Sequence, residues 1–205
     1  MVRPMPLTPG HQSGSTLYEQ ALAIAAHIHT LANEKEFAEK ANSPNYLDEI
    51  SFTDHVASLE YRIHSLKSSS NPSYPIPNPA KRHMLFVAFA LASLIYVYSA
   101  LRDFPENCLL LLDLQHQLEV TIGDVDYITA YSTHPEVMVW VLLVGGSVPR
   151  SESATKSFSR LMMAASVEIG FDATEDGILG AIGEFPWRPC KSQNGRALFW
   201  ETLAQ

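Results

Sequence analysis

The sequence predicts an all-α protein: a single irregular helical domain with about seven to nine helices. Three observations predict this class. Apolar residues recur every three or four positions in several long segments, no segment alternates apolar and polar residues as a strand does, and Pro, Gly, Asn and Ser separate the periodic segments. The chain of 205 residues is 46% hydrophobic. This supply of apolar side chains is enough for one core and excludes wholesale disorder.

The first predicted helix spans residues 16–40 and follows a flexible N-terminal tail, residues 1–14, rich in Pro, Gly and Ser. Thr16 and Glu19 have the spacing of a capping box, which favours a helix start at this point. Apolar side chains on one helical stripe follow the cap: Leu17, Ala21, Ile24, Ile28 and Leu31. We therefore expect one face of this helix to enter the core.

The second predicted helix starts near Ser43, a typical capping residue, with Pro44 at its first helical position. It has the clearest amphipathic pattern in the chain: Phe52, Val56, Leu59, Ile63 and Leu66. Residues 68–79 follow, with four prolines and three consecutive serines. This composition excludes a helix or a central strand and predicts a surface loop.

The remainder of the chain is compatible with helices at about 80–103, 105–121, 124–131, 134–145, 151–169 and 173–185, and with a final amphipathic turn near residues 198–200. The apolar run 137–144 would also fit a strand, but the helix-start pattern His134-Pro135 precedes it and favours a helix. Asp172 and Glu175 predict a second capping box. We expect residues 15–205 to form one domain, with 68–79 as a loop within it.

The segment 84–101 contains 18 residues without a charge, which is long enough to be a marginal membrane span. A less apolar stripe through Ala92, Tyr96 and Ser99, with basic residues flanking both ends, instead favours a buried core helix. The N-terminus has no apolar stretch typical of a secretory signal. The expected location is therefore intracellular, either cytoplasmic or nuclear, and membrane attachment is a minor alternative.

The charge balance of 14 Lys and Arg against 22 Asp and Glu gives a net charge of −8. An acidic chain repels phosphate backbones, so we expect no direct binding of nucleic acid. The two cysteines, Cys108 and Cys190, are too few for a Cys₄ zinc site or a disulfide framework. A phosphate-binding loop, a dinucleotide-binding glycine motif and an HExxH motif are also absent from the sequence, so no metal and no cofactor are expected.

Acidic residues are concentrated in the stretch 103–149, which contains no Lys or Arg. Its carboxylates are Asp103, Glu106, Asp113, Glu119, Asp124, Asp126 and Glu136. An apolar cavity with such a rim would favour neutral or cationic ligands over anions. A solvated acidic surface would produce the same pattern, so both interpretations stay open.

Asp113 and His116 are the candidate catalytic residues, because a carboxylate three positions from an imidazole on a helix can orient it as a general base. The alternative is an ordinary exposed helix face opposite a leucine-rich side. Tyr127, His134 and Trp140 are the candidate ligand-binding residues. His134 could equally be a residue of a helix cap, and Trp140 a packing anchor of the core.

Several short segments resemble parts of the fungal-specific transcription factor domain, which is the helical domain of regulators with a zinc binuclear cluster. The segments occur in the same order as in that domain, over about 150 residues. They are VASLEYRIHSL from Val56, Arg82-His83 with the run ending LIYVY, His134-Pro135 through VWVLLVGG, Phe158–Arg160, Ile169-Gly170-Phe171, Glu184-Phe185-Pro186-Trp187 and Gly195–Trp200. The resemblance implies an all-α fold, an effector pocket and surfaces for partners. It corresponds to the C-terminal half of that domain, without the N-terminal half and without the six-cysteine zinc cluster that reads DNA.

The sequence leads to two functional hypotheses of different classes. The first is a freestanding regulator-like domain that binds a hydrophobic, neutral or cationic small molecule or a protein partner, with a homodimer as one option. The alternative is a cofactor-free enzyme of fungal secondary metabolism, a cyclase, isomerase or dehydratase, that uses a pocket lined by histidine and carboxylate groups.

Overall fold

The computed structural model describes residues 16–41, 48–70, 80–105, 108–147, 152–187 and 193–204, and the regular structure in these ranges is entirely helical. The elements are α1 (Leu17–Ala41), α2 (Glu49–Ser70), α3 (Ala80–Tyr96), the π-helix η1 (Val97–Leu101), α4 (Leu109–Gly123), α5 (Tyr127–Thr133), α6 (Pro135–Ser147), α7 (Glu152–Ile169), α8 (Glu175–Ile182) and α9 (Gln193–Leu203). The all-α class and the expected number of helices are confirmed.

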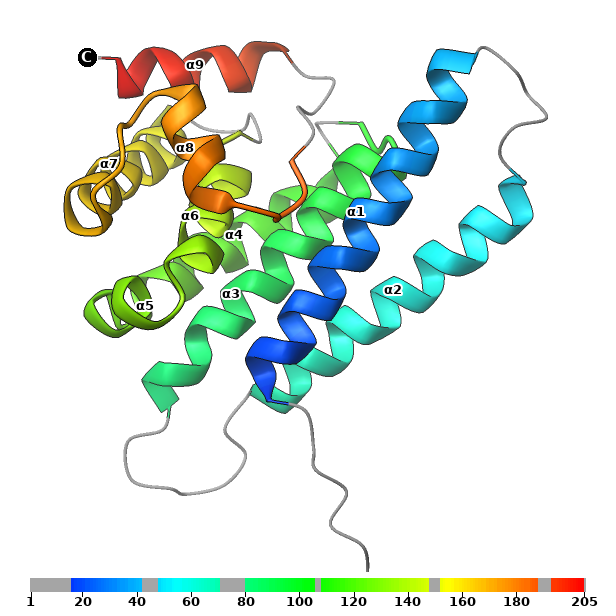
Figure 1. Ribbon diagram of the computed structural model, residues 1–205, viewed down its shortest axis with the longest axis horizontal. Coiled ribbons are helices and arrows are strands. Elements are labelled where there is room, and N and C mark those ends of the chain that lie inside the picture. Colours follow the sequence, from blue (N-terminus) through cyan, green and yellow to red (C-terminus); the bar gives the residue numbers. More distant parts are fainter. Residues whose placement is uncertain are drawn as a thin grey trace, which may run out of the picture.

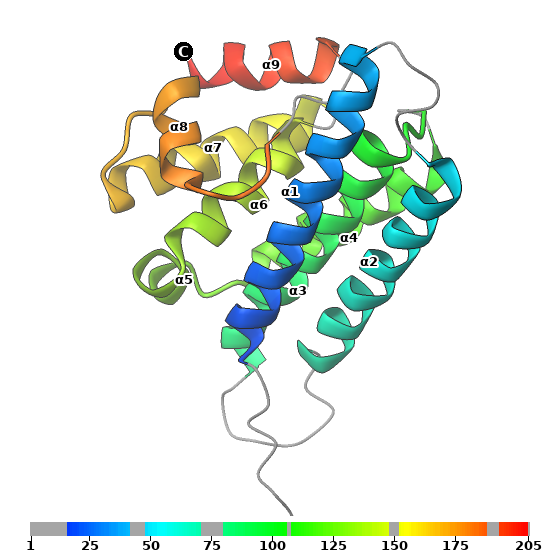
Figure 2. The same ribbon diagram turned by 45° about the vertical axis from the view of Figure 1, so that its right-hand side comes forward.

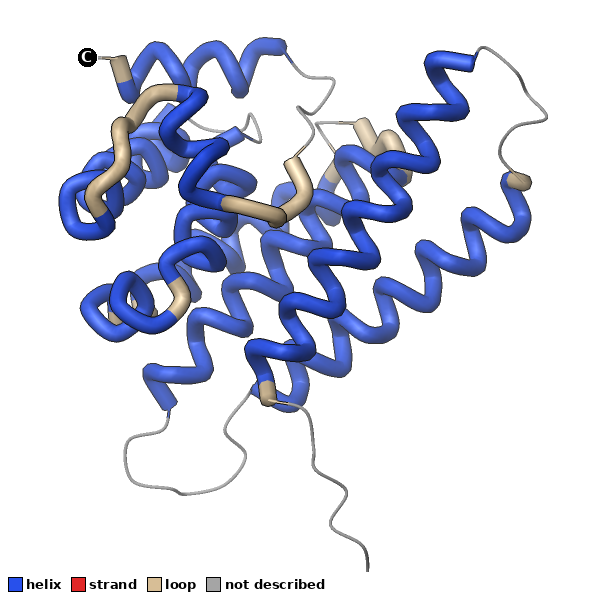
Figure 3. Tube along the Cα trace, in the orientation of Figure 1, coloured by secondary structure: helices blue, strands red, loops and turns tan. Residues whose placement is uncertain are grey.

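Helix α3 lies at the centre of the fold, and five other helices, α1, α2, α4, α5 and α6, pack against it (Figures 1 and 2). Helices α1 and α2 run alongside it, α4 covers another side, and α6 covers the side that faces the second half of the chain. Helices α7, α8 and α9 pack on α6 and extend the core away from α3. Figure 3 shows the short described connections between α4 and α5, between α5 and α6, and between α7 and α8.

The start of α1 forms the predicted capping box. The Thr16 N–H donates to Glu19 Oε2 at 2.7 Å, and the Glu19 N–H donates back to Thr16 Oγ1 at 3.2 Å. The predicted apolar stripes of the first two helices also face the core: Ala21, Ile24, Ile28 and Leu31 of α1, and Val56, Leu59, Ile63 and Leu66 of α2, are all buried. The predicted cap at Ser43 and Pro44 and the predicted tail 1–14 lie outside the described residues.

Several predicted boundaries shift by a few residues, and two of the differences have a clear cause. Residues 68–70 continue α2 instead of opening the loop 68–79, because Ser68 Oγ donates to the His64 carbonyl at 2.9 Å and so fits the last helical turn. Residues 71–79 of that loop are outside the described part of the chain. The second capping box does not form at Asp172: Thr174 caps α8 instead, accepting from the Gly177 N–H at 3.2 Å.

The run 137–144 is helical, as predicted, and α6 is buried from Val137 to its end at Ser147. Its last turn contains Gly145 and Gly146. A β-carbon at Gly146 would overlap the Phe199 ring of α9, and one at Gly145 would overlap Phe158 of α7. The two glycines therefore allow α7 and α9 to pack closely against α6.

The segment His83–Leu101 is long and apolar enough to cross a membrane, and within the described part of the chain it is the one candidate. In this fold 83% of its apolar window is buried inside the protein. Neighbouring helices, rather than lipid, cover its apolar side chains. The sequence-based preference for a core helix agrees with this position.

The C-terminal end of the segment His83–Leu101 is a π-helix, Val97–Leu101, which the sequence patterns did not predict. A buried lysine from α1 closes it: Lys35 Nζ donates to the Ala100 and Leu101 carbonyls, each at 2.9 Å, and to Asp103 Oδ2 at 2.7 Å. Asp103 has a positive φ of 51°. Arg102 forms a second link, a two-pronged pair with Glu60 of α2 at 2.6 and 3.2 Å. These contacts fix α1 and α2 to the end of η1.

We predict that Lys35→Met lowers the free energy of unfolding by about 2–3 kcal/mol, because two buried carbonyls lose a charged donor. Lys40→Met, on the exposed last turn of the same helix, should change it by less than about 0.5 kcal/mol. Urea denaturation followed by circular dichroism measures both values. Equal midpoints for the two variants would contradict the capping role of Lys35.

Candidate ligand-binding pocket

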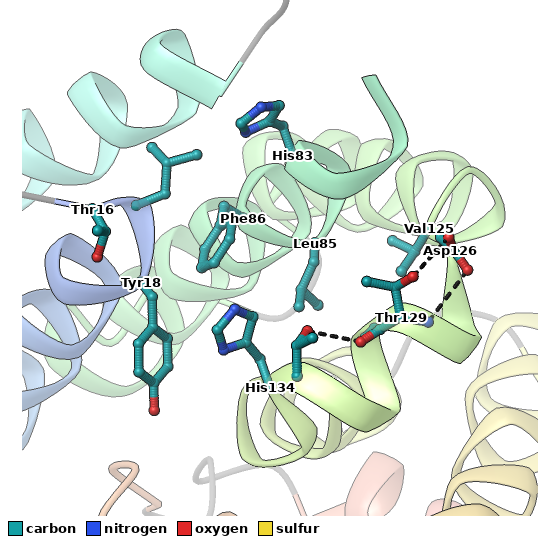
Figure 4. A pocket seen from close by; sticks show the side chains of 12 residues that line it. Thr16, Tyr18, His83, Leu85, Phe86, Val125, Asp126, Thr129 and His134 are labelled. Carbon is teal, nitrogen blue, oxygen red and sulfur yellow. Dashed lines mark hydrogen bonds between the residues drawn. The ribbon is translucent and has the colours of Figure 1, made fainter. Parts of the chain in front are cut away.

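A pocket of about 600 Å³ opens where the starts of α1 and α3 meet α5 (Figure 4). Its lining comes from four places in the chain: the first residues of α1, the first turns of α3, the turn before α5, and α5 with the residue that follows it. The lining residues are Thr16, Leu17, Tyr18, His83, Leu85, Phe86, Val125, Asp126, Thr129, Ala130, Thr133 and His134. Small-molecule sites in proteins have volumes in the same range.

Most of the pocket wall is apolar. Leu85 and Phe86 of α3 and Val125 of the turn before α5 contribute apolar side chains (Figure 4). Ala130 of α5 also lines the pocket. These side chains also belong to the continuous core of the protein. The wall is therefore an extension of the core surface and holds its shape through packing that involves α3 and α5.

His134 is the central polar group of the pocket. Its ring stacks on Tyr18 with centroids 4.4 Å apart and meets the edge of Phe86 at 5.4 Å. Its Nδ1 atom is buried and has no hydrogen-bond partner among the residues that the structure describes. Burial lowers the pKa of His134 below the ordinary 6.5, although the Glu136 carboxylate offsets part of this effect. The imidazole is therefore neutral near pH 7.

Tyr18 donates its hydroxyl proton to Glu136 Oε1 at 2.6 Å. This hydrogen bond is the main reason that the pKa of Tyr18 rises to about 12, with burial and the Glu136 charge as smaller contributions. The phenol thus stays protonated at neutral pH. The bond also joins the start of α1 to the start of α6 and keeps the Tyr18 ring stacked against His134.

Asp126, the only carboxylate in the described lining, caps α5. It accepts from the Thr129 N–H at 3.4 Å and from Thr129 Oγ1 at 2.9 Å. No Lys or Arg belongs to the described lining. His83, at the start of α3, adds a second buried Nδ1 atom that none of the described residues pairs. The pocket therefore offers hydrogen-bonding nitrogens but no permanent cation for an anionic ligand.

The other sequence candidates lie elsewhere. Asp113 and His116 are exposed on α4, where Asp113 Oδ2 accepts from Gln117 Nε2 at 2.7 Å. Trp140 is fully buried in α6 and donates its Nε1 proton to the Pro186 carbonyl at 2.6 Å, as a packing anchor does. The Tyr127 hydroxyl donates to the Ile122 carbonyl at 2.7 Å. Of the five candidates, His134 alone lines the pocket.

Tyr18 is a site residue that sequence reasoning missed, and Glu136 was noted only as one of the carboxylates of the stretch 103–149. The helical stripe of α1 did not include Tyr18, and 118 positions separate the two residues in the chain. No local signal in the sequence connects them. The described residues include no group of three or more His, Cys, Asp or Glu that could hold a metal ion.

Comparison with known proteins gives one match. A model of the fungal specific transcription factor domain matches residues 17–170. The match spans α1 to α7 and so includes every element that lines the pocket. No curated protein and no solved structure is significantly similar to this chain.

We predict that His134→Leu flattens the pH dependence of stability between neutral and mildly acidic pH. The lowered pKa means that the unfolded chain binds a proton near pH 6.5 before the folded protein does, so folding stability is lost as pH falls through 6.5. Unfolding free energies measured in urea at several pH values test this. If wild type and variant lose stability in parallel below pH 6.5, His134 is not a buried neutral imidazole.

Proposed function

Because the chain belongs to the fungal specific transcription factor domain family, we propose that it is a regulator-like module that binds an uncharged, mainly apolar small molecule and does not itself bind DNA. The observation that carries the proposal is the pocket of about 600 Å³ between α1, α3 and α5. Its lining includes a neutral imidazole whose buried Nδ1 atom is unpaired among the described residues. An unpaired buried nitrogen costs free energy that a ligand hydrogen bond would recover.

The lining defines the chemistry of the ligand. Apolar walls from Leu85, Phe86 and Ala130 supply affinity through burial of apolar surface. His134 and His83 supply one or two hydrogen bonds that orient the ligand. Asp126 and the absence of a described Lys or Arg disfavour an anion. A neutral ligand with a hydroxyl or carbonyl group at one end fits best.

The position of the pocket also suggests how ligand binding would affect recognition by a partner protein. The pocket joins the starts of α1, α3 and α5, and the Tyr18–Glu136 hydrogen bond connects its wall to α6. A ligand that bridges these elements would stabilise their arrangement, which a partner in transcription could then recognise. A cytoplasmic or nuclear location belongs to the same proposal.

The enzyme alternative has less support. Its candidate residues, Asp113 and His116, are exposed on α4 and do not line this pocket. The Asp113 carboxylate is engaged by Gln117. A cyclase, isomerase or dehydratase would need its acid and base beside a bound substrate.

We predict that the neutral dye Nile red binds the pocket and that Thr133→Trp weakens its binding at least about tenfold. Thr133 is an exposed residue of the pocket lining, so an indole at this position fills space without disturbing the core. Ser132→Trp is the matched control, because the adjacent side chain is exposed but is not part of the lining. Fluorescence titration gives both dissociation constants.

Competition experiments should then show whether the pocket prefers a neutral ligand or an anionic one. Dodecanol should displace Nile red at lower concentration than dodecanoate does at neutral pH, since the described lining offers no cation to the carboxylate. Identical titrations for the two tryptophan variants would show that the dye binds elsewhere and would overturn the proposed site. Stronger displacement by dodecanoate would overturn the proposed ligand class.

We also predict that the chain does not bind duplex DNA. Its net charge of −8 repels the phosphate backbone, and the two cysteines cannot form a binuclear zinc cluster. The anisotropy of a fluorescent 30-base-pair duplex should stay constant up to about 10 µM protein at physiological salt. A salt-dependent rise in anisotropy would contradict this part of the proposal.

A further inference from the structure

A second cavity lies at the opposite end of the segment formed by α3 and η1 from the first pocket. It has a volume of about 430 Å³ and opens between the start of α2 and the turn that follows η1 (Figure 2). Its described lining comes from the first two turns of α2 and from Leu101, Arg102 and Phe104. About 20 Å of helix lies between Phe86 in the first pocket and Leu101 here, so the two cavities are separate.

One wall of this second cavity is aromatic and is held in a fixed position. The Phe104 ring stacks on Tyr98, with centroids 5.2 Å apart and ring planes 13° apart, and the Phe104 N–H donates to the Tyr98 carbonyl at 2.8 Å. Phe52 of α2 adds a second ring to the lining, and Val56 and Leu101 add buried aliphatic side chains. A planar aromatic molecule fits such a wall, because aromatic rings favour stacked and edge-on contacts.

The turn that carries Phe104 is fixed from inside the protein. Lys35 holds the Ala100 and Leu101 carbonyls and the Asp103 carboxylate. The positive φ of Asp103, 51°, gives the turn its direction. Single turns of π-helix are frequent at functional sites, and η1 ends at Leu101 in the cavity wall. The wall is therefore formed before a ligand arrives, which lowers the cost of binding.

Arg102 is the hydrogen-bond donor of the cavity. Its Nε and Nη2 atoms donate to the Glu60 carboxylate, at 2.6 and 3.2 Å, whereas its Nη1 atom makes no hydrogen bond with a described residue. Glu60 offsets the charge of Arg102, and the exposed Glu49 adds a carboxylate to the lining. The donor is therefore available, but the surrounding charge does not favour an anion. An uncharged carbonyl oxygen is the acceptor that matches these groups.

We propose that this cavity is a second binding site, which takes a small planar aromatic molecule with an uncharged carbonyl group. The ring of the ligand lies against Phe104 and Phe52, and its carbonyl oxygen accepts from Arg102 Nη1. The volume is within the range of small-molecule sites. The two cavities share no described lining residue, so this site does not depend on the ligand proposed for the first pocket.

The neutral aromatic lactone 7-methoxycoumarin is a suitable probe for the full chain. Its fluorescence anisotropy, measured as protein is added, should give a dissociation constant below about 1 mM. Thr53→Trp should weaken binding at least about tenfold, because Thr53 is an exposed residue of the lining and an indole there fills the cavity. Two controls should bind as wild type does: Ser58→Trp, exposed on α2 outside the lining, and Thr133→Trp, which fills the first pocket.

Arg102→Lys tests the hydrogen bond to the carbonyl group. Lysine keeps a positive charge beside Glu60 but lacks the second donor nitrogen of the guanidinium. This variant should weaken 7-methoxycoumarin binding at least about fivefold. It should leave the affinity for 2-methoxynaphthalene, a bicyclic aromatic without a carbonyl, within about twofold of the wild-type value. Equal losses for the two compounds would overturn the role of Arg102.

Other outcomes would overturn the site itself. These are a wild-type chain that does not bind 7-methoxycoumarin saturably, and a Thr53→Trp variant that binds it as wild type does. Weaker binding in Thr133→Trp alone would place the compound in the first pocket and would also overturn the second site. Neither tryptophan alters a buried residue, so unchanged helical circular dichroism is expected for both variants.

Discussion

Helix α3 is apolar on nearly every side, and the rest of the fold follows from the need to cover it. Helices α1, α2, α4 and α6 all pack against it, and α7 to α9 complete the burial of α6 in turn. The two ends of the segment formed by α3 and η1 differ in what covers them. Polar groups close the η1 end, where Lys35 caps two carbonyls and Arg102 pairs with Glu60. At the other end the cover is incomplete, and Leu85 and Phe86 line a pocket.

The pocket joins an apolar surface to a few hydrogen-bonding groups whose protonation is fixed by their surroundings. Burial keeps His134 neutral, and the Glu136 carboxylate keeps the Tyr18 hydroxyl protonated. Because Asp126 serves as the cap of α5, its charge is already compensated by donors from Thr129. These features favour an uncharged ligand, and they are set by elements within the segment that matches the fungal specific transcription factor domain.

Local sequence patterns predicted most of the fold and little of the site. The stripes of α1 and α2, the Thr16–Glu19 capping box and the helical state of α6 depend on neighbours within a few residues, so the sequence reveals them. The Lys35 cap and the Tyr18–Glu136 bond join residues 65 to 118 positions apart, and no local pattern signals such pairs. The acidic stretch 103–149 does not form a single rim. Its described carboxylates are dispersed from the turn after η1, through α4 and the turn before α5, to the first turn of α6, and Asp126 alone lines the pocket.

The central claim is that a neutral, apolar ligand occupies the space between α1, α3 and α5. Methyl-resolved NMR of the protein with dodecanol tests it most directly, because methyl groups report contact at individual residues. The account predicts that the methyl signals of Leu85, Val125 and Ala130 shift with a common saturating dependence, while those of Leu142 and Val144, buried in α6, stay unchanged. Unchanged signals from the pocket methyl groups at saturating dodecanol, or shifts confined to exposed α4 and α7 residues, would contradict it.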